Sequence, residues 1–140
     1  MTGVLLDTNV ISEMTRVAPD PAVVAYLVSE PDLWLSTVVI HELQLGIHLR
    51  PAGRRRDQAS DLIEALVSTS RRIVPVGLAE AEHASELRAR ARRSGRTLHL
   101  ADALIAATAG LRRLPLATRN IRDFEGLGLH LINPWESPAA

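Results

Sequence analysis

The 140-residue sequence predicts an α/β protein, a three-layer α/β/α sandwich with a central parallel sheet. Short apolar segments alternate with longer amphipathic segments along the whole chain, and strands separated by helices form parallel βαβ units. The chain is long enough for one hydrophobic core, and it contains no repeat or linker. We therefore expect a single domain over residues 1–140 whose sheet is buried between helical layers.

The first half of the chain begins with an apolar strand that runs into a helix. The expected elements are a strand over 3–7, helices over 8–16 and 19–31, a strand over 33–36 and a helix over 37–50. Pro21 fits the first turn of the second helix, where a missing amide hydrogen is tolerated. The hydroxyl oxygen of Ser36 or Thr37 is suited to cap the third helix.

The second half alternates in the same way. The expected elements are a helix over 55–70, a strand over 72–76, helices over 79–95 and 100–113, a strand over 114–118, a loop or single turn over 120–128 and a final strand over 129–135. The helix over 79–95 is polar, whereas the helix over 100–113 is apolar on nearly every side. A helix of the second kind is buried.

The composition excludes several classes of protein. The sequence has no cysteine, which rules out disulfides, thiol chemistry and cysteine-ligated metals. No apolar segment approaches the length of a membrane span, and the start of the chain does not resemble a secretory signal. We therefore expect a cytoplasmic protein.

The charges are balanced but unevenly distributed. Sixteen basic and sixteen acidic residues give a net charge of zero, which neither predicts nor excludes a nucleic-acid partner. All sixteen basic residues are arginine, so no mechanism can use a lysine amine. The segment ELRARARRSGR includes Arg88, Arg92, Arg93 and Arg96, which are candidates for docking phosphates. A solvated helix face gives the same pattern.

Asp7 is the first of three carboxylates in unusual positions. It ends the apolar run of the first expected strand, and ligands of open α/β sheets bind beyond the carboxyl ends of the strands. An aspartate at a strand end also caps the following helix in many proteins. Thr8 or Asn9 could cap this helix equally well.

Glu42 and Asp102 lie within apolar helices. Glu42 interrupts a stripe of apolar residues at helical spacing. The stripe consists of Val38, Leu45 and Leu49. A buried, unpaired carboxylate costs several kcal/mol or becomes neutral, so both positions call for an explanation. The alternatives are that the head of Glu42 reaches water and that amides of the first helical turn stabilise Asp102.

A further group of polar residues follows the strand over 114–118. Thr118, Asn120 and Asp123 follow its carboxyl end, so we expect them at the same edge of the sheet as Asp7. Asparagine and aspartate are also ordinary turn residues. Three or four acidic groups at one edge repel one another unless a cation or protons compensate. Oxygen ligands without cysteine or a histidine pair suit Mg²⁺ or Mn²⁺, which activates water and neutralises charge on a phosphodiester.

Four segments carry these residues in a distinctive order and spacing. They are LLDTNVIS, HELQLGI, LADALIAATA and LATRNIRDFEGLGLHLINPW. In this combination the chain resembles PIN-domain ribonucleases, specifically the toxins of type II toxin–antitoxin pairs of the VapC and FitB type. The resemblance spans essentially the whole chain, and it implies a PIN-like fold and Mg²⁺-dependent RNA hydrolysis by an acidic cluster.

The resemblance assigns roles to individual residues. Asp7, Glu42 and Asp102 match the first, second and third motif carboxylates, which implies that they are catalytic and hold the metal. Some members of the family have aspartate where this chain has Asn120, so Asp123 is the alternative fourth catalytic group. Two threonines match polar positions of the family that could orient carboxylates or the attacking water. They are Thr8 and Thr118.

The resemblance also implies partners. These are a second copy of the chain in a homodimer, an RNA substrate and a VapB-like antitoxin. The C-terminal segment of such an antitoxin blocks the active-site groove, in many cases with an arginine among the carboxylates. The antitoxin would carry the DNA-binding domain, so DNA would be bound only through it.

Other classes fit less well. A phosphotransferase of the haloacid-dehalogenase type needs aspartate where Asn9 stands, and both it and a receiver domain need a lysine that is missing. A zinc protease needs a second histidine four residues after His41, where the chain has Leu45. The remaining alternative is a PIN protein that is weak or inactive as an enzyme and serves as the partner of a DNA-binding antitoxin. Asn120 favours this alternative, and the three retained carboxylates oppose it.

Overall fold

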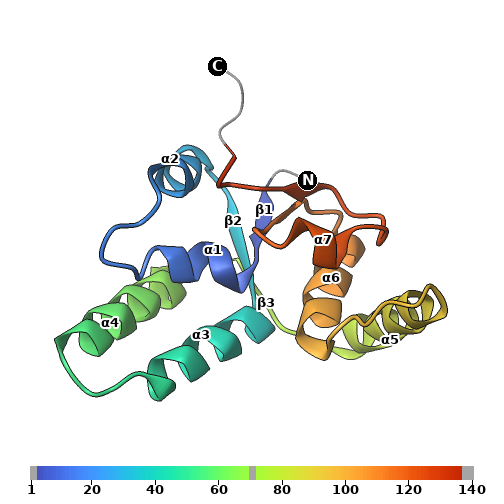
Figure 1. Ribbon diagram of the computed structural model, residues 1–140, viewed down its shortest axis with the longest axis horizontal. Helices are drawn as coiled ribbons and strands as arrows, with labels where there is room; N and C mark the ends of the chain where they lie inside the picture. Colours follow the sequence, from blue (N-terminus) through green and yellow to red (C-terminus); the bar gives the residue numbers. More distant parts are fainter. Residues whose placement is uncertain (1–2, 70–71, 137–140) are drawn as a thin grey trace.

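The computed structural model describes residues 3–69 and 72–136, and its centre is a five-stranded parallel sheet (Figure 1). The strands are β1 Val4–Leu6, β2 Leu33–Ser36, β3 Ile73–Val74, β4 Leu116–Ala117 and β5 Leu131–Ile132. Their order is β3-β2-β1-β4-β5, and every neighbouring pair is parallel. The predicted parallel α/β arrangement is confirmed.

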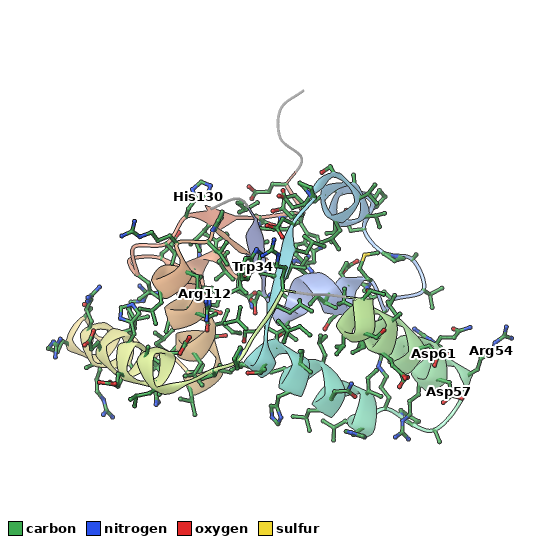
Figure 2. The ribbon with its side chains drawn as sticks, turned by 180° about the vertical axis from the view of Figure 1, so that it is seen from behind. Trp34, Arg54, Asp57, Asp61, Arg112 and His130 are labelled. Carbon is green, nitrogen blue, oxygen red and sulfur yellow. The ribbon has the colours of Figure 1, made fainter. Side chains whose placement is uncertain are left out.

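Helices cover the sheet from both sides. They are α1 Thr8–Glu13, α2 Pro21–Ser29, α3 Thr37–Leu49, α4 Arg54–Thr69, α5 Leu78–Arg93, α6 Leu100–Arg112 and α7 Ile121–Phe124. Figure 1 shows α1, α3 and α4 on one side of β1 and β2, with α5 and α6 on the other. Side chains fill the space between these layers, as Figure 2 shows around Trp34. Within residues 3–69 and 72–136, no helix is long and apolar enough to cross a membrane.

The core forms where the sequence is continuously apolar. All three residues of β1 are buried, as expected for a central strand with helices on both faces. The apolar helix predicted over 100–113 is α6, and it is buried as predicted. Its buried face is rich in alanine, which lets the helix lie close to its neighbours. These alanines are Ala103, Ala106, Ala107 and Ala109.

The strand order creates a crevice beside β1. The chain passes from β1 outward to β2 and β3, and then returns to β4 on the opposite side of β1. Connections therefore leave β1 and β4 in opposite directions, which opens a space at the carboxyl ends of these two strands. Asp7 directly follows β1, and Thr118 directly follows β4.

The apolar stripe proposed around Glu42 is wrong. The buried face of α3 consists of Val39, Leu43 and Ile47, whereas Leu45 and Leu49 are 47% and 76% exposed. Because α3 has apolar residues on several faces, its periodicity does not determine which face meets the sheet and α4. Glu42 is therefore half-buried at the boundary of the core rather than inside an apolar face.

Several predicted elements are shorter than expected. The helix predicted over 8–16 ends at Glu13, because the amides of Met14 and Thr15 bond to carbonyls only three residues back and tighten the last turn. The strands predicted over 72–76 and 129–135 keep two residues each. Pro75 and Pro134 follow them closely and cannot donate to a sheet.

The structure also tests the predicted cap of the helix over 37–50 and the predicted loop or single turn over 120–128. Ser36 caps α3, since its Oγ accepts a hydrogen bond from the amide of Val38 at 3.0 Å. The segment over 120–128 contains the single helical turn α7, which buries Phe124. Ser70, the end of the helix predicted over 55–70, lies outside the described residues.

Candidate active site

Asp7 is held in one orientation at the carboxyl end of β1. The side chain is only 4% exposed. Its Oδ1 accepts a hydrogen bond from the amide of Thr8 at 2.8 Å, and its Oδ2 accepts one from the Thr118 hydroxyl at 2.7 Å. Asp7 is also the N-cap of α1, so the capping role suggested for an aspartate at this place belongs to it. The hydrogen bond that caps α1 therefore also helps to fix the orientation of the Asp7 carboxylate.

Thr118 connects Asp7 to the segment after β4. While its hydroxyl donates to Asp7, the same oxygen accepts a hydrogen bond from the amide of Asn120 at 3.0 Å. The side chain is fully buried. The hydroxyl therefore fixes both the carboxylate and the start of the turn that leads into α7.

Thr8 connects α1 to α3. Its hydroxyl donates a short hydrogen bond to Oε1 of Glu42 at 2.6 Å. Glu42 is thereby directed toward the N-terminus of α1, where Asp7 lies. The contact places the second predicted carboxylate beside the first although 34 residues separate the bonded pair.

The electrostatics of Asp102 show that four carboxylates share one region. Asp102 lies in the first turn of α6, and its pKa is raised to about 6, mainly because the side chain is partly buried. The charges of three further carboxylates add to this rise. They are Asp7, Asp123 and Glu42. Burial also raises the pKa of Asp7, against the hydrogen bonds from Thr118 and Thr8 that lower it.

Within residues 3–69 and 72–136, none of the four carboxylates forms a direct ion pair, although the charge of nearby His99 lowers the pKa of Asp102 and partly opposes the rise. The ion pairs found within residues 3–69 and 72–136 involve Glu13, Asp32, Glu80 and Glu86, but none of the four carboxylates. A group of carboxylates without a counter-ion is stable only if protons or a cation compensate the charge. We therefore name Asp7, Glu42, Asp102 and Asp123 the acidic cluster.

The outer members of the predicted site border a hollow of about 650 Å³. Asn120 and Asp123 are both exposed and line this hollow together with Arg119 and Arg122. The guanidinium of Arg119 lies 5.0 Å from the ring centre of Trp135, and it forms no ion pair with a carboxylate among the described residues. The backbone amide of Asn120 donates a hydrogen bond to the Thr118 hydroxyl oxygen, and the Asn120 side chain makes no capping bond to α7.

The donor set of the acidic cluster fits a hard divalent cation. It offers carboxylate oxygens and an excess of negative charge, which is what Mg²⁺ or Mn²⁺ selects. In the described part of the chain, however, no three acidic or histidine side chains already stand at the mutual spacing of metal ligands. The four carboxylates are therefore electrostatic neighbours that do not yet stand at the spacing of metal ligands.

One residue of the site was not predicted. Asn9 donates from Nδ2 to Oδ2 of Asp7 at 3.3 Å, and its Oδ1 accepts from the amide of Arg119 at 3.3 Å. It thus bridges the loops that follow β1 and β4. The only sequence signal was its place two residues after Asp7, which does not reveal a partner 110 residues away.

The predicted arginines lie on α5 and in the segment that follows it, and none forms an ion pair with the acidic cluster among the described residues. Arg88, Arg92 and Arg93 are exposed on α5, and Arg96 lies in the segment that connects α5 to α6. Arg88, Arg92 and Arg96 line a hollow of their own, and Arg93 does not.

Comparison with known proteins agrees with this geometry. The PIN domain family model matches residues 4–128. The VapC ribonuclease Y4jK of Sinorhizobium fredii is 39% identical over 137 residues, which cover 95% of this chain and 98% of that protein. The toxin FitB of Neisseria gonorrhoeae is 35% identical over 136 residues, which cover 94% and 98%.

Solved structures show the same architecture. The structure of FitAB bound to an IR36 DNA fragment matches with a TM-score of 0.88 at 34% identity, and it covers 97% of this chain and 98% of that one. The structure of FitAcB from Neisseria gonorrhoeae matches with a TM-score of 0.86 at 36% identity, and it covers 95% and 99%. With a family model that spans most of its length and relatives that align end to end, the chain belongs to the PIN-domain family.

Proposed function

We propose that this protein is an endoribonuclease that depends on a divalent metal and serves as the toxin of a type II toxin–antitoxin module. The observation that carries the proposal is the acidic cluster, which gathers four carboxylates beside the carboxyl ends of β1 and β4 with no direct ion pair to any of them among the described residues. Relatives named VapC ribonuclease and tRNA(fMet)-specific endonuclease VapC, the second at 28% identity, support the same activity.

Three residues of the cluster would hold the metal. Asp7 is buried, whereas Asp102 on α6 and Glu42 on α3 are half-buried. The exposed Asp123 or Asn120 would complete the site on its outer side. A bound Mg²⁺ or Mn²⁺ lowers the pKa of water and neutralises charge on a phosphodiester.

The neighbouring hydroxyls position these carboxylates. The Thr118 hydroxyl and the Thr8 amide bind one oxygen each of Asp7, so its plane cannot rotate freely. The Thr8 hydroxyl does the same for one oxygen of Glu42. Such outer contacts support the affinity of a metal site and lower the entropic cost of assembling it.

The partners follow from the same proposal. The relatives were solved as complexes called FitAB and VapBC, some of them with DNA. For this chain we propose a homodimer and a VapB-like antitoxin, with DNA bound only through the antitoxin. An antitoxin arginine inserted into the acidic cluster would supply a direct ion pair, which these carboxylates do not form among the described residues.

RNA cleavage tests the proposal directly. Wild-type protein is incubated with total RNA in Mg²⁺ and in EDTA, beside Asp7→Asn and Asp102→Asn. Asp61→Asn is the matched control, because Asp61 is exposed on the outer face of α4 (Figure 2). We expect cleavage by wild type and Asp61→Asn in Mg²⁺ only, and none by the two site variants, with unchanged circular dichroism.

Two results would overturn the proposal. If Asp102→Asn cut RNA as fast as wild type, the acidic cluster would not be the catalytic centre. If the wild-type protein neither bound Mg²⁺ by calorimetry nor cut RNA, the chain would be an inactive partner of an antitoxin. Asn120, in place of the aspartate that some family members carry, is the feature that favours this second outcome.

A further inference from the structure

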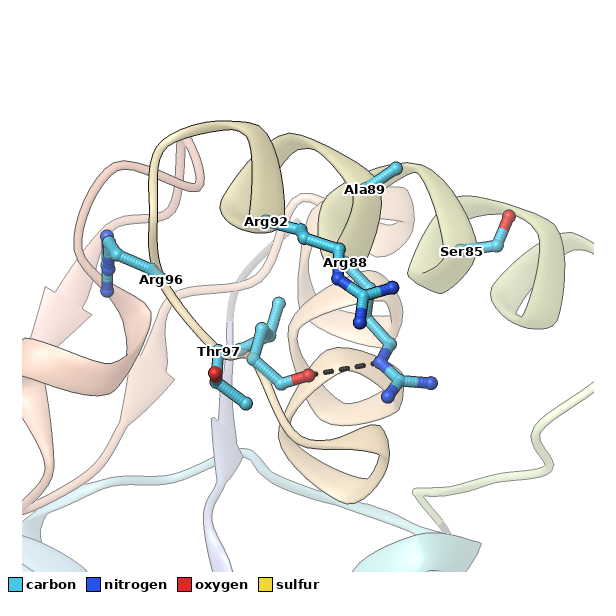
Figure 3. A pocket seen from close by; sticks show the side chains of 7 residues that line it. Ser85, Arg88, Ala89, Arg92, Arg96 and Thr97 are labelled. Atoms are coloured by element: carbon cyan, nitrogen blue, oxygen red, sulfur yellow. Dashed lines mark hydrogen bonds between the residues drawn. The ribbon is translucent and has the colours of Figure 1, made fainter.

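A second polar hollow lies between α5 and the segment that leads into α6 (Figure 3). Its volume is about 410 Å³. The lining includes Arg88, Ala89, Arg92, Arg96, Thr97 and Leu98. Arg88 and Arg92 lie one turn apart on α5, and Ala89 adds a small side chain to the lining. We name this hollow the arginine groove.

Two guanidinium groups in the arginine groove are left free to bind an anion. Arg88 is tethered by one bond, from its Nε to the carbonyl of Leu98 at 3.0 Å, which leaves both terminal nitrogens without a partner among the described residues. The guanidinium of Arg92 has no hydrogen-bond or ion-pair partner within residues 3–69 and 72–136, and its backbone carbonyl accepts a bond from the amide of Gly95. Figure 3 shows both side chains reaching into the groove.

The other arginines of this region are used differently. Arg96 donates to the carbonyls of Glu125 and Arg122 at 2.6 and 2.7 Å, so its terminal nitrogens already fix the segment around α7. Arg90 and Arg93 lie on α5 outside the lining of the groove. Attraction to the helix C-terminus accounts for positive charge in the last turn of α5. It does not account for Arg88, which lies a turn earlier and is tethered toward the next segment.

The arginine groove lies close to the acidic cluster along the chain. Leu98, whose carbonyl holds Arg88, comes four residues before Asp102, and four residues span at most about 14 Å. An RNA strand whose reacting phosphate lies at the acidic cluster would therefore reach the groove within a few nucleotides.

We propose that Arg88 and Arg92 bind the phosphodiester backbone of the RNA substrate beside the cleaved bond. This inference rests on the proposed ribonuclease function and adds a substrate-binding site to it. A planar guanidinium matches the oxygens of a phosphate with two parallel hydrogen bonds, and two such groups one turn apart repel each other until an anion lies between them. The Thr97 hydroxyl, exposed and without a partner in the described chain, is a further donor. Backbone contacts of this kind hold RNA without reading its sequence.

The test compares two double variants that remove equal charge from the same helix. Arg88→Ala/Arg92→Ala removes the free pair, and Arg90→Ala/Arg93→Ala is the matched control. Binding of a short fluorescein-labelled single-stranded RNA is measured by anisotropy in EDTA between 50 and 200 mM salt. We expect the first variant to bind at least about tenfold more weakly at the lowest salt. Its slope of log affinity against log salt should fall by about 1.4, or roughly 0.7 for each lost phosphate contact. The control should change affinity less than about threefold.

A second pair of variants tests the groove without removing any arginine, in case the double arginine variants fail to fold. Ala89→Glu puts a carboxylate inside the groove, whereas Ala81→Glu puts one elsewhere on the exposed surface of α5. We expect only Ala89→Glu to weaken RNA binding. Equal changes in RNA affinity for the two variants of either pair would overturn the inference. If both variants weakened binding equally, general charge alone would explain the effect. If neither weakened it, the groove would serve another ligand, such as an acidic protein.

Cleavage in Mg²⁺ separates this inference from the proposed function. If wild type cuts RNA and Arg88→Ala/Arg92→Ala raises KM with little change in kcat, both stand. If wild type cuts RNA and that variant has an unchanged KM, the groove is not a substrate site although the nuclease proposal survives. If wild type binds RNA through the arginine pair but never cuts it, the binding site stands and the nuclease proposal fails.

Discussion

Replacing Asp102 by asparagine should stabilise the metal-free protein at neutral pH. The pKa of Asp102 is raised from 3.8 to about 6, so the folded state binds the proton more tightly than the unfolded state does. The stabilising contribution of this proton is complete below pH 3.8 and is lost as the pH rises through 6. At pH 7.5 the ionised Asp102 side chain therefore destabilises the folded state, and asparagine, which carries no charge, removes this destabilisation.

The size of the effect follows from the pKa. The difference between 3.8 and about 6 corresponds to roughly 3 kcal/mol for a fully buried group. Because Asp102 is only half-buried, we discount this to about 1–2 kcal/mol. For a chain of this length, that free energy raises Tm by about 3–6 °C.

Thermal unfolding in EDTA checks both sign and size. We expect Asp102→Asn to exceed wild type in Tm at pH 7.5 and to approach it at pH 4, whereas Asp61→Asn should match wild type at both. Added Mg²⁺ should raise the Tm of wild type more than that of Asp102→Asn, since a ligand stabilises only the state that binds it. A gain at pH 7.5 that persists unchanged at pH 4, or no gain at all, would refute the raised pKa of Asp102 in the folded protein.

Two further substitutions test how the site is held. Thr118→Val removes the hydroxyl that binds Asp7, so Mg²⁺ affinity by calorimetry and the cleavage rate should each fall about 10- to 100-fold, while Thr118→Ser should keep most of both. Equal values for valine and serine would contradict a role for the hydroxyl. Arg96→Ala removes the bonds to the Arg122 and Glu125 carbonyls and should lower the free energy of unfolding by about 1–2 kcal/mol. Hydrogen exchange around α7 should speed up at the same time, and unchanged exchange there would argue against this anchoring.

The positions of Asp7 and Asp102 could be predicted because their signals are local. Asp7 directly ends a continuous apolar run, and the rule that parallel strands present their carboxyl ends at one edge then places it at the crevice. Asp102 is an acid in the first turn of a helix that is apolar nearly all round, which only a buried helix can be. Neither inference needs to know which strands are neighbours.

The contacts that complete the site depend on tertiary packing. Thr118 meets Asp7 only because β4 lies beside β1, and 111 residues separate the two side chains along the chain. Local pattern does not determine that strand order. The face of α3 is a similar case, since both Leu45 and Leu43 have helical neighbours at apolar positions. Packing against the sheet and α4 buries Leu43 and leaves Leu45 exposed.

A net charge of zero is compatible with a nucleic-acid partner because the two signs are kept apart. If Arg88 or Arg92 were paired with the acidic cluster, both groups would be neutralised, and neither a cation nor a phosphate would gain by binding. In the structure Arg88 is instead bonded to the carbonyl of Leu98 and Arg96 to the carbonyls around α7. Asp7 and Glu42 accept hydrogen bonds from threonine hydroxyls and from the amide of Thr8. RNA with its metal ions carries both complementary charges at once. Binding of RNA with its metal ions would therefore compensate both the negative charge of the acidic cluster and the positive charge of the arginine groove.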